Sequence, residues 1–138
     1  MAIEDAIKTQ WGNDSTLNGL IPSTSVSVGD ILGTEGAECP DPTDELPRAR
    51  VSVLSDKFIG SNQTSYETHE ITVLTTCSSN SSANLIRASL HEAFHNKTWT
   101  ANGHYVELAR VTGTDKRQQE DSGNWQLETT IITRSVEV

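Results

Sequence analysis

The stretch 82–96, SANLIRASLHEAFHN, constrains the fold most because it is the only long segment with a helical hydrophobic period. A serine at 81 or 82 can cap its first turn, and Asn96 suits the left-handed position that ends a helix. A single strong helix among several strands buries its apolar side by lying across their sheet. We therefore expect 82–96 to be the main helix of a two-layer domain. Its apolar stripe consists of Ala83, Ile86, Leu90, Ala93 and Phe94.

The same helix contains His91, Glu92 and His95 in the pattern H-E-x-x-H. Two histidines one turn apart can bind one Zn²⁺, and the glutamate between them can act as a general base. One interpretation of the chain is therefore a small zinc-dependent hydrolase that uses these three residues.

The helical angles favour a different interpretation. With Leu90 at zero and about 100° per residue, His91 and His95 fall near 100° and 140°, on the flank of the apolar stripe. Glu92 falls near 200° and points to solvent. The extended zinc motif needs Gly and His where Thr98 and Ala101 stand, which leaves only His104 and Glu107 as possible third ligands. We expect no catalytic residue, no metal and no cofactor, and keep the zinc hydrolase as the alternative.

Composition narrows the class of protein further. The chain has 138 residues, which suits one domain over 1–138, and its apolar fraction of 34% is low. The net charge is −9 and no long Lys/Arg run exists, so we expect neither a nucleic-acid-binding surface nor adhesion to anionic membranes. The N-terminus lacks the apolar run of a signal peptide, and we expect synthesis in the cytoplasm with Cys39 and Cys77 unpaired.

Alternation of polar and apolar residues predicts five strands around the main helix. The predicted fold is α+β, with an antiparallel or mixed sheet, one main helix on one face and the order α–β–β–β–α–β–β. We expect His69 to be an edge or surface group. The predicted helix is 3–11 with a further turn at 17–21, and the predicted strands are 23–29, 48–55, 67–77, 105–112 and 125–138. Polar connections are predicted at 56–66 and 113–124.

The connection 33–46 is acidic and contains two prolines and two glycines. Its acid spacing does not fit a calcium-binding loop, so we interpret it as a solvated loop. Its acids are Glu35, Glu38, Asp41, Asp44 and Glu45.

The last predicted strand changes phase along its length. Trp125, Leu127 and Ile131 share one face, whereas Ile132 and Val136 share the other with the terminal valine. Either a bulge or burial of both faces would explain this, and burial of both faces requires a neighbouring subunit. We therefore predict subunit contacts in the C-terminal hairpin. The candidate interface residues are Trp125, Leu127, Ile132, Arg134, Val136 and Val138.

The layout resembles the tail-terminator and tail-completion (minor tail) proteins of long-tailed bacteriophages. The resemblance lies in the order of elements and in three weak local patterns. These are Leu17-Asn18-Gly19-Leu20-Ile21 at the end of the first helix, Leu46-Pro47-Arg48-Ala49-Arg50-Val51 at the start of a strand, and the A-x-x-I-x-x-x-L pattern over 83–90. The long acidic loop 33–46 departs from the family pattern.

The resemblance implies a structural virion protein without enzyme activity. It implies a homo-oligomeric ring, commonly a hexamer, at the head-proximal end of the tail, in contact with tail tube and head–tail connector proteins. In such a ring we place the acidic loop 33–46 at the lumen or a rim, where repeated negative charge repels DNA phosphate. A head–tail connector subunit in the neck of the particle is a further alternative, because it differs from a terminator mainly in what it touches.

Overall fold

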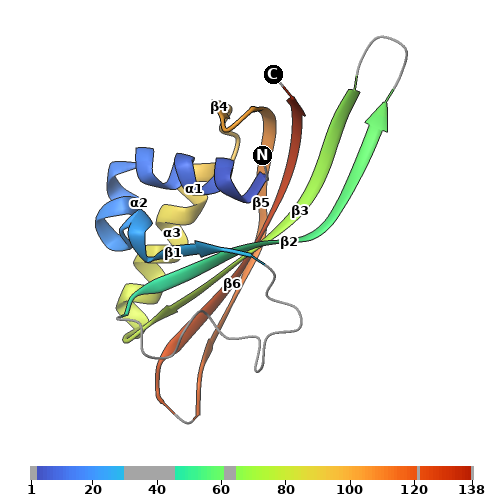
Figure 1. Cartoon of the computed structure of the whole chain (residues 1–138). Coiled ribbons are helices and arrows are strands. Elements are labelled where there is room, and N and C mark those ends of the chain that lie inside the picture. The colour runs from blue at the N-terminus through green and yellow to red at the C-terminus, as the bar shows by residue number, and fades with distance from the viewer. Residues whose placement is uncertain (1–2, 30–45, 61–64, 121, 138) are drawn as a thin grey trace.

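The computed structural model describes residues 3–29, 46–60, 65–120 and 122–137. Three α-helices and one 3₁₀ turn accompany six strands (Figure 1). The helices are α1 (Ile3–Asn13), α2 (Ser15–Leu20) and α3 (Asn80–Phe94), with the turn η1 at Ser23–Ser25. The strands are β1 (Val26–Val28), β2 (Arg48–Gly60), β3 (Ser65–Cys77), β4 (Trp99–Ala101), β5 (His104–Gln118) and β6 (Trp125–Glu137).

The six strands form one sheet in the order β1-β2-β3-β6-β5-β4. β1 pairs in parallel with β2, and every other neighbouring pair is antiparallel, so the sheet is mixed. The helices lie on one side of the sheet, as Figure 1 shows. The α+β class is therefore as predicted. The predicted further turn at 17–21 is the separate helix α2, and β4 is an addition to the predicted order.

The main helix α3 begins two residues earlier than predicted. The cap is Ser79, whose hydroxyl accepts a hydrogen bond from the backbone N–H of Ser82 at 3.1 Å. The helix ends at Phe94, two residues before the predicted limit, but Asn96 has φ 59° in the left-handed region, as predicted. Serines at 78, 79, 81 and 82 all offer a cap, which explains the error at the start.

The core lies between α1, α3 and the sheet. Leu90 and Phe94 of α3 are fully buried in the same apolar cluster as Val51 and Ile71 of the sheet. α3 packs more extensively on β5 and β6 than on β3, and α1 covers β2. α1 and α3 therefore cover the sheet together.

Helix α1 is held by residues from the second half of the chain. The indole N–H of Trp99 donates to the carbonyl oxygen of Ala6 at 3.0 Å. The side-chain amide of Gln10 donates to the carbonyl oxygen of Ala93 at 3.2 Å. Trp11 of α1 is fully buried, and its indole N–H donates to the carbonyl oxygen of Ile21 at 2.9 Å.

Two hairpins are longer than the sequence predicted. β2 and β3 pair as far as Gly60 and Ser65, so the predicted polar connection 56–66 is wrong at both ends. β5 continues to Gln118, within the predicted connection 113–124. Polar residues extend these strands because backbone pairing does not require an apolar side chain on an exposed ribbon. The two hairpins extend beyond the helices at opposite ends of the sheet (Figure 1).

A short hairpin precedes β5 and was not predicted. β4 and β5 are joined by the two residues Asn102 and Gly103, which have φ 52° and 81°. Asn-Gly is a strong signal for a two-residue hairpin turn with positive φ at both positions.

The last strand does not change phase. Leu127, Ile131 and Ser135 are all buried on the helix-covered face of β6, and Ile132 and Val136 are half-buried on the other. The irregularities of the C-terminal hairpin lie in β5, where the register shifts between Val106 and Leu108 and between Val111 and Gly113. Among the described helices, none is long and apolar enough to cross a membrane.

Candidate functional site

His91 and His95 lie on the exposed flank of α3, as the helical angles predicted. His91 and Glu92 are exposed and His95 is half-buried. The two imidazole rings stack with their centroids 4.3 Å apart and an angle of 22° between their planes. The Nδ1 atom of His95 accepts a hydrogen bond from the backbone N–H of Val111 at 3.1 Å. His95 therefore joins the end of α3 to β5, at the second register shift of that strand.

This hydrogen bond opposes zinc binding at His95. A neutral imidazole has one N–H and one lone pair, and the lone pair of His95 is occupied by Val111. The proton then sits on Nε2, which cannot ligate a metal without losing it. In the part of the chain that the structure describes, no group of three or more His, Cys, Asp or Glu residues is placed to hold a metal ion.

A groove of about 550 Å³ runs between α3 and β5 beside this pair. One wall is formed by exposed side chains of α3 and the other by the bulged part of β5. The charges of Arg87 and Glu92 on the helix wall have opposite signs. The two hydroxyls of its lining are engaged with β6: Thr112 donates to the carbonyl oxygen of Thr130 at 3.4 Å, and the hydroxyls of Thr114 and Thr129 lie 3.2 Å apart. Its lining residues are Arg87, Ala88, His91, Glu92, Val111, Thr112, Gly113 and Thr114.

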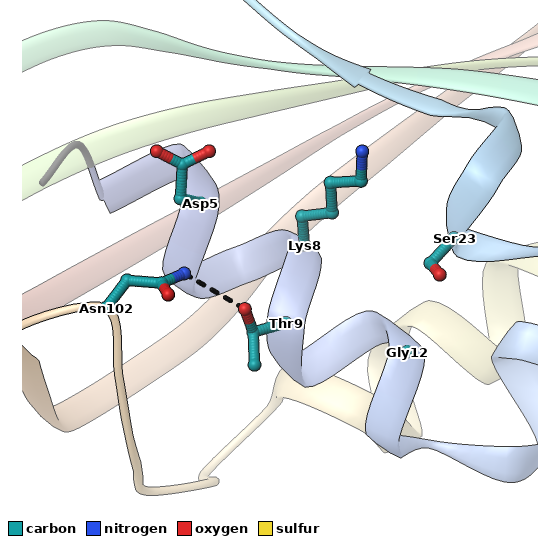
Figure 2. A pocket seen from close by; sticks show the side chains of 6 residues that line it. All are labelled: Asp5, Lys8, Thr9, Gly12, Ser23 and Asn102. Atoms are coloured by element: carbon teal, nitrogen blue, oxygen red, sulfur yellow. Dashed lines mark hydrogen bonds between the residues drawn. The ribbon is translucent and has the colours of Figure 1, made fainter.

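A second hollow, of about 410 Å³, lies between α1, η1 and the β4–β5 turn. Figure 2 shows Asp5, Lys8 and Thr9 on α1, with Asn102 reaching across from the turn. The side-chain amide of Asn102 donates to the Thr9 hydroxyl at 2.9 Å. This hydrogen bond connects the β4–β5 turn to α1. The residues that line the hollow are mostly polar or charged.

His69 is buried, so the prediction of an edge or surface group is wrong. It lies on β3, directly between Asp56 of β2 and Thr133 of β6, with only 4% of its surface exposed. Its Nε2 lies 3.0 Å from Oε2 of Glu67. β3 is an interior strand of the sheet, so its neighbours bury His69 although the side chain is polar. This burial depends on the order of the strands, which cannot be read from the sequence alone.

The candidate interface residues have several different environments. Leu127 is fully buried in the core, and Ile132 and Val136 are half-buried on the opposite face. Trp125 is half-buried with the Lys116 ammonium 5.4 Å from its ring centroid. Val138 and the acids Glu35, Glu38, Asp41, Asp44 and Glu45 lie outside the described residues, as does Cys39.

Arg134 is the exposed member of the candidate set. Its Nε lies 2.6 Å from Oε1 of Glu107 on β5, and its guanidinium lies 5.3 Å from the ring centroid of Tyr66 on β3. It therefore links three strands on the face away from the helices.

β6 is an interior strand, and this changes where an exposed edge is found. It pairs with β3 on one side and with β5 on the other along nearly its whole length. The free edge of the C-terminal hairpin belongs to β5 at 113–118, which sequence reasoning had assigned to a connection. Exposed residues here include Asp115, Lys116 and Arg117.

No protein-family model matches the sequence, and no curated protein matches it. The structure is similar to a chain in a solved structure described as "Virion of native gene transfer agent (GTA) particle". The likeness covers 97% of this chain and 94% of that chain, with a TM-score of 0.69 and 14% sequence identity. At this identity the likeness establishes a shared fold over essentially the whole chain.

Proposed function

We propose that this chain is a structural virion protein, a tail-terminator or tail-completion subunit that forms a ring at the head-proximal end of a phage-like tail. One observation carries the proposal: the fold matches a chain of a gene transfer agent virion over 97% of its length. The sequence resemblance to tail-terminator proteins points to the same kind of particle. The proposed partners are further copies of this chain, the tail tube and the head–tail connector.

The proposed role is not enzymatic. The H-E-x-x-H histidines lie beside the helix–sheet core, and the lone pair of His95 on Nδ1 is taken by Val111. A subunit that stops tube growth needs two different faces and a closed arrangement of copies, not a catalytic group. The net charge of −9 suits a passage for DNA that does not retain phosphate.

A closed ring of more than two copies needs a subunit whose two contacting surfaces differ. The sheet offers such a pair because its long hairpins extend in opposite directions (Figure 1). A head–tail connector subunit has the same requirement and is the alternative role within this class.

Sedimentation velocity and negative-stain imaging of the purified protein test this proposal. We expect closed rings, with the hexamer as the first candidate, that bind one end of preassembled tail tubes. Rings that bind the portal side of an isolated head instead of the tube would favour the connector role. A protein that stays monomeric at high concentration, both alone and beside tail tubes, would contradict the proposal.

A further inference from the structure

One buried part of the helix-covered face of the sheet is polar. It is formed by Glu67 and His69 of β3 and by Thr133 and Ser135 of β6, which we call the polar cluster. His69 lies directly opposite Thr133, and Glu67 lies directly opposite Ser135. All four share a face with the core residue Ile71, because positions two apart along a strand point to the same side.

Three of the four side chains are almost completely buried. His69 has 4% of its surface exposed, and Thr133 and Ser135 are fully buried. Glu67 is half-buried. Burying a polar group without a hydrogen bond costs free energy, and nearly all such groups in folded proteins have a partner. The partners of these three side chains therefore need to be identified.

One contact within the cluster is direct. Nε2 of His69 lies 3.0 Å from Oε2 of Glu67. A carboxylate can only accept a hydrogen bond, so the proton of a neutral imidazole lies on Nε2 and Nδ1 is left as an acceptor. Within the described part of the chain, Nδ1 of His69 and the hydroxyl oxygens of Thr133 and Ser135 have no hydrogen-bond partner. The cluster thus contains one acceptor and two hydroxyls whose bonds are not made by the protein.

We propose that the polar cluster binds one ordered water molecule, held by Nδ1 of His69 and by the hydroxyls of Thr133 and Ser135. A buried water typically makes about three hydrogen bonds to groups that otherwise have no partner. Here it donates one hydrogen to Nδ1 and shares hydrogen bonds with the two hydroxyls, each of which can donate or accept. The inference concerns the interior of one subunit and does not depend on the ring-forming role.

The register of the strands places the three groups within reach of one water. Directly opposite residues, such as His69 and Thr133, have Cβ atoms about 4.5–5.5 Å apart. Diagonal neighbours, such as His69 and Ser135, are farther apart but still within reach of an aromatic side chain. Two hydrogen bonds through one water join polar atoms up to about 5.5 Å apart, which suits these spacings.

The neighbouring part of β5 favours a water over close packing. Thr133 pairs with Ala109, which has a single methyl group as its side chain, and Ser135 pairs with Val106. The register of β5 shifts between Val106 and Leu108, and such an irregularity disrupts the ladder locally and bends the strand. Small side chains beside an irregular strand leave the hydroxyls without a tightly packed neighbour.

Thr75 of β3 provides a contrast on the same face. Its hydroxyl is also fully buried and has no hydrogen-bond partner among the described residues. Its directly paired neighbours are Ala49 and Leu127, which both belong to the apolar core. A buried water needs two to four polar partners, so we expect the surroundings of Thr75 to be dry.

Replacing Thr133 by valine tests the water, because the two side chains have nearly the same shape. We expect Thr133→Val to raise the equilibrium constant of unfolding about fivefold, because the water loses a partner in a buried site. Thr75→Val is the matched control, and we expect it to lower the constant or leave it unchanged, because it removes a buried hydroxyl that has no partner.

The sign of the change decides between a hydrated and a dry cluster. In a dry cluster the hydroxyl of Thr133 is as unpartnered as that of Thr75, and its removal stabilises the fold. A constant that is unchanged or lower in Thr133→Val would therefore overturn the proposal. Urea unfolding measures both variants against the unmodified protein.

A second variant tests whether the two hydroxyls hold the same water. We expect Ser135→Ala to raise the unfolding constant as well. The double variant with Thr133→Val should be less destabilised than the two single changes together, because either change already disrupts the shared water. Fully additive effects would show that the hydroxyls act separately and would overturn a single bound water.

A high-resolution crystal structure of the protein shows the water directly. We expect a density peak at about 2.5–3.2 Å from Nδ1 of His69 and from the hydroxyl oxygens of Thr133 and Ser135. An empty cluster, or a direct hydrogen bond between Thr133 and His69 that leaves no space for a water, would overturn the inference.

Discussion

The backbone N–H of Val111 donates a 3.1 Å hydrogen bond to Nδ1 of His95 and so ties the end of the main helix to the irregular part of β5. The interaction gives His95 a structural role at this position. The two histidines of the motif therefore differ in environment. His95 is half-buried and accepts this hydrogen bond, whereas His91 stacks on His95 and has an exposed side chain.

His91→Ala should change the free energy of unfolding by less than about 0.5 kcal/mol, as for an ordinary surface site. His95→Ala should cost about 1 kcal/mol, because the half-buried N–H of Val111 loses its acceptor. Urea unfolding of the two variants measures the difference. Stoichiometric zinc in protein purified without added metal, lost in both variants, would show that the hydrolase alternative had been set aside wrongly.

Leu90→Ala should lower the free energy of unfolding by roughly 2–5 kcal/mol, because Leu90 is fully buried between α3 and the sheet. The same helix provides its own control in Leu85, which is 58% exposed. Leu85→Ala should cost less than about 0.5 kcal/mol. Equal costs for the two variants would mean that α3 presents another face to the sheet.

Cys77 should make stability depend on pH in the alkaline range. Burial raises the pKa of its thiol above the ordinary value, so the folded state keeps the proton where the unfolded state loses it. Stability is therefore unaffected below pH of about 9 and falls as the pH rises above it.

Urea unfolding at pH 8 and pH 10 in a Cys39→Ser background measures the effect. Cys77→Ala in the same background should remove the part of the alkaline loss that the thiol causes. A loss of the same size in both proteins would mean that other groups account for it.

The sequence predicted those parts of the fold that carry a periodic apolar pattern. The stripe through Leu90 and Phe94 located α3, and the alternation through Ile71 and Val73 located β3. Element ends were less accurate, because strand residues at 56–60 and 113–118 have no apolar alternation to mark them. The signal for β4 was present in Asn102-Gly103 and was not used.

For the predicted interface, the sequence located the C-terminal hairpin but not which of its two strands lies nearer the edge of the sheet. Which strand of that hairpin has a free edge depends on sheet order, and a sequence does not state that order. β6 inserts beside β3, which turns its apolar residues inward and leaves β5 at the outside. The parallel pairing of β1 with β2 and the burial of His69 depend on the same long-range arrangement.

The contacts of Ala6 with Trp99 and of Gln10 with Ala93 join the first helix to residues made much later. During synthesis at about 5–20 residues per second, α1 emerges many seconds before its partners exist. An interrupted chain therefore displays the apolar side of α1, including Trp11, to chaperones and proteases. Only a chain completed through the second half can bury that side, so we expect a chain that stops before residue 93 to be cleaved by proteases faster than the complete one.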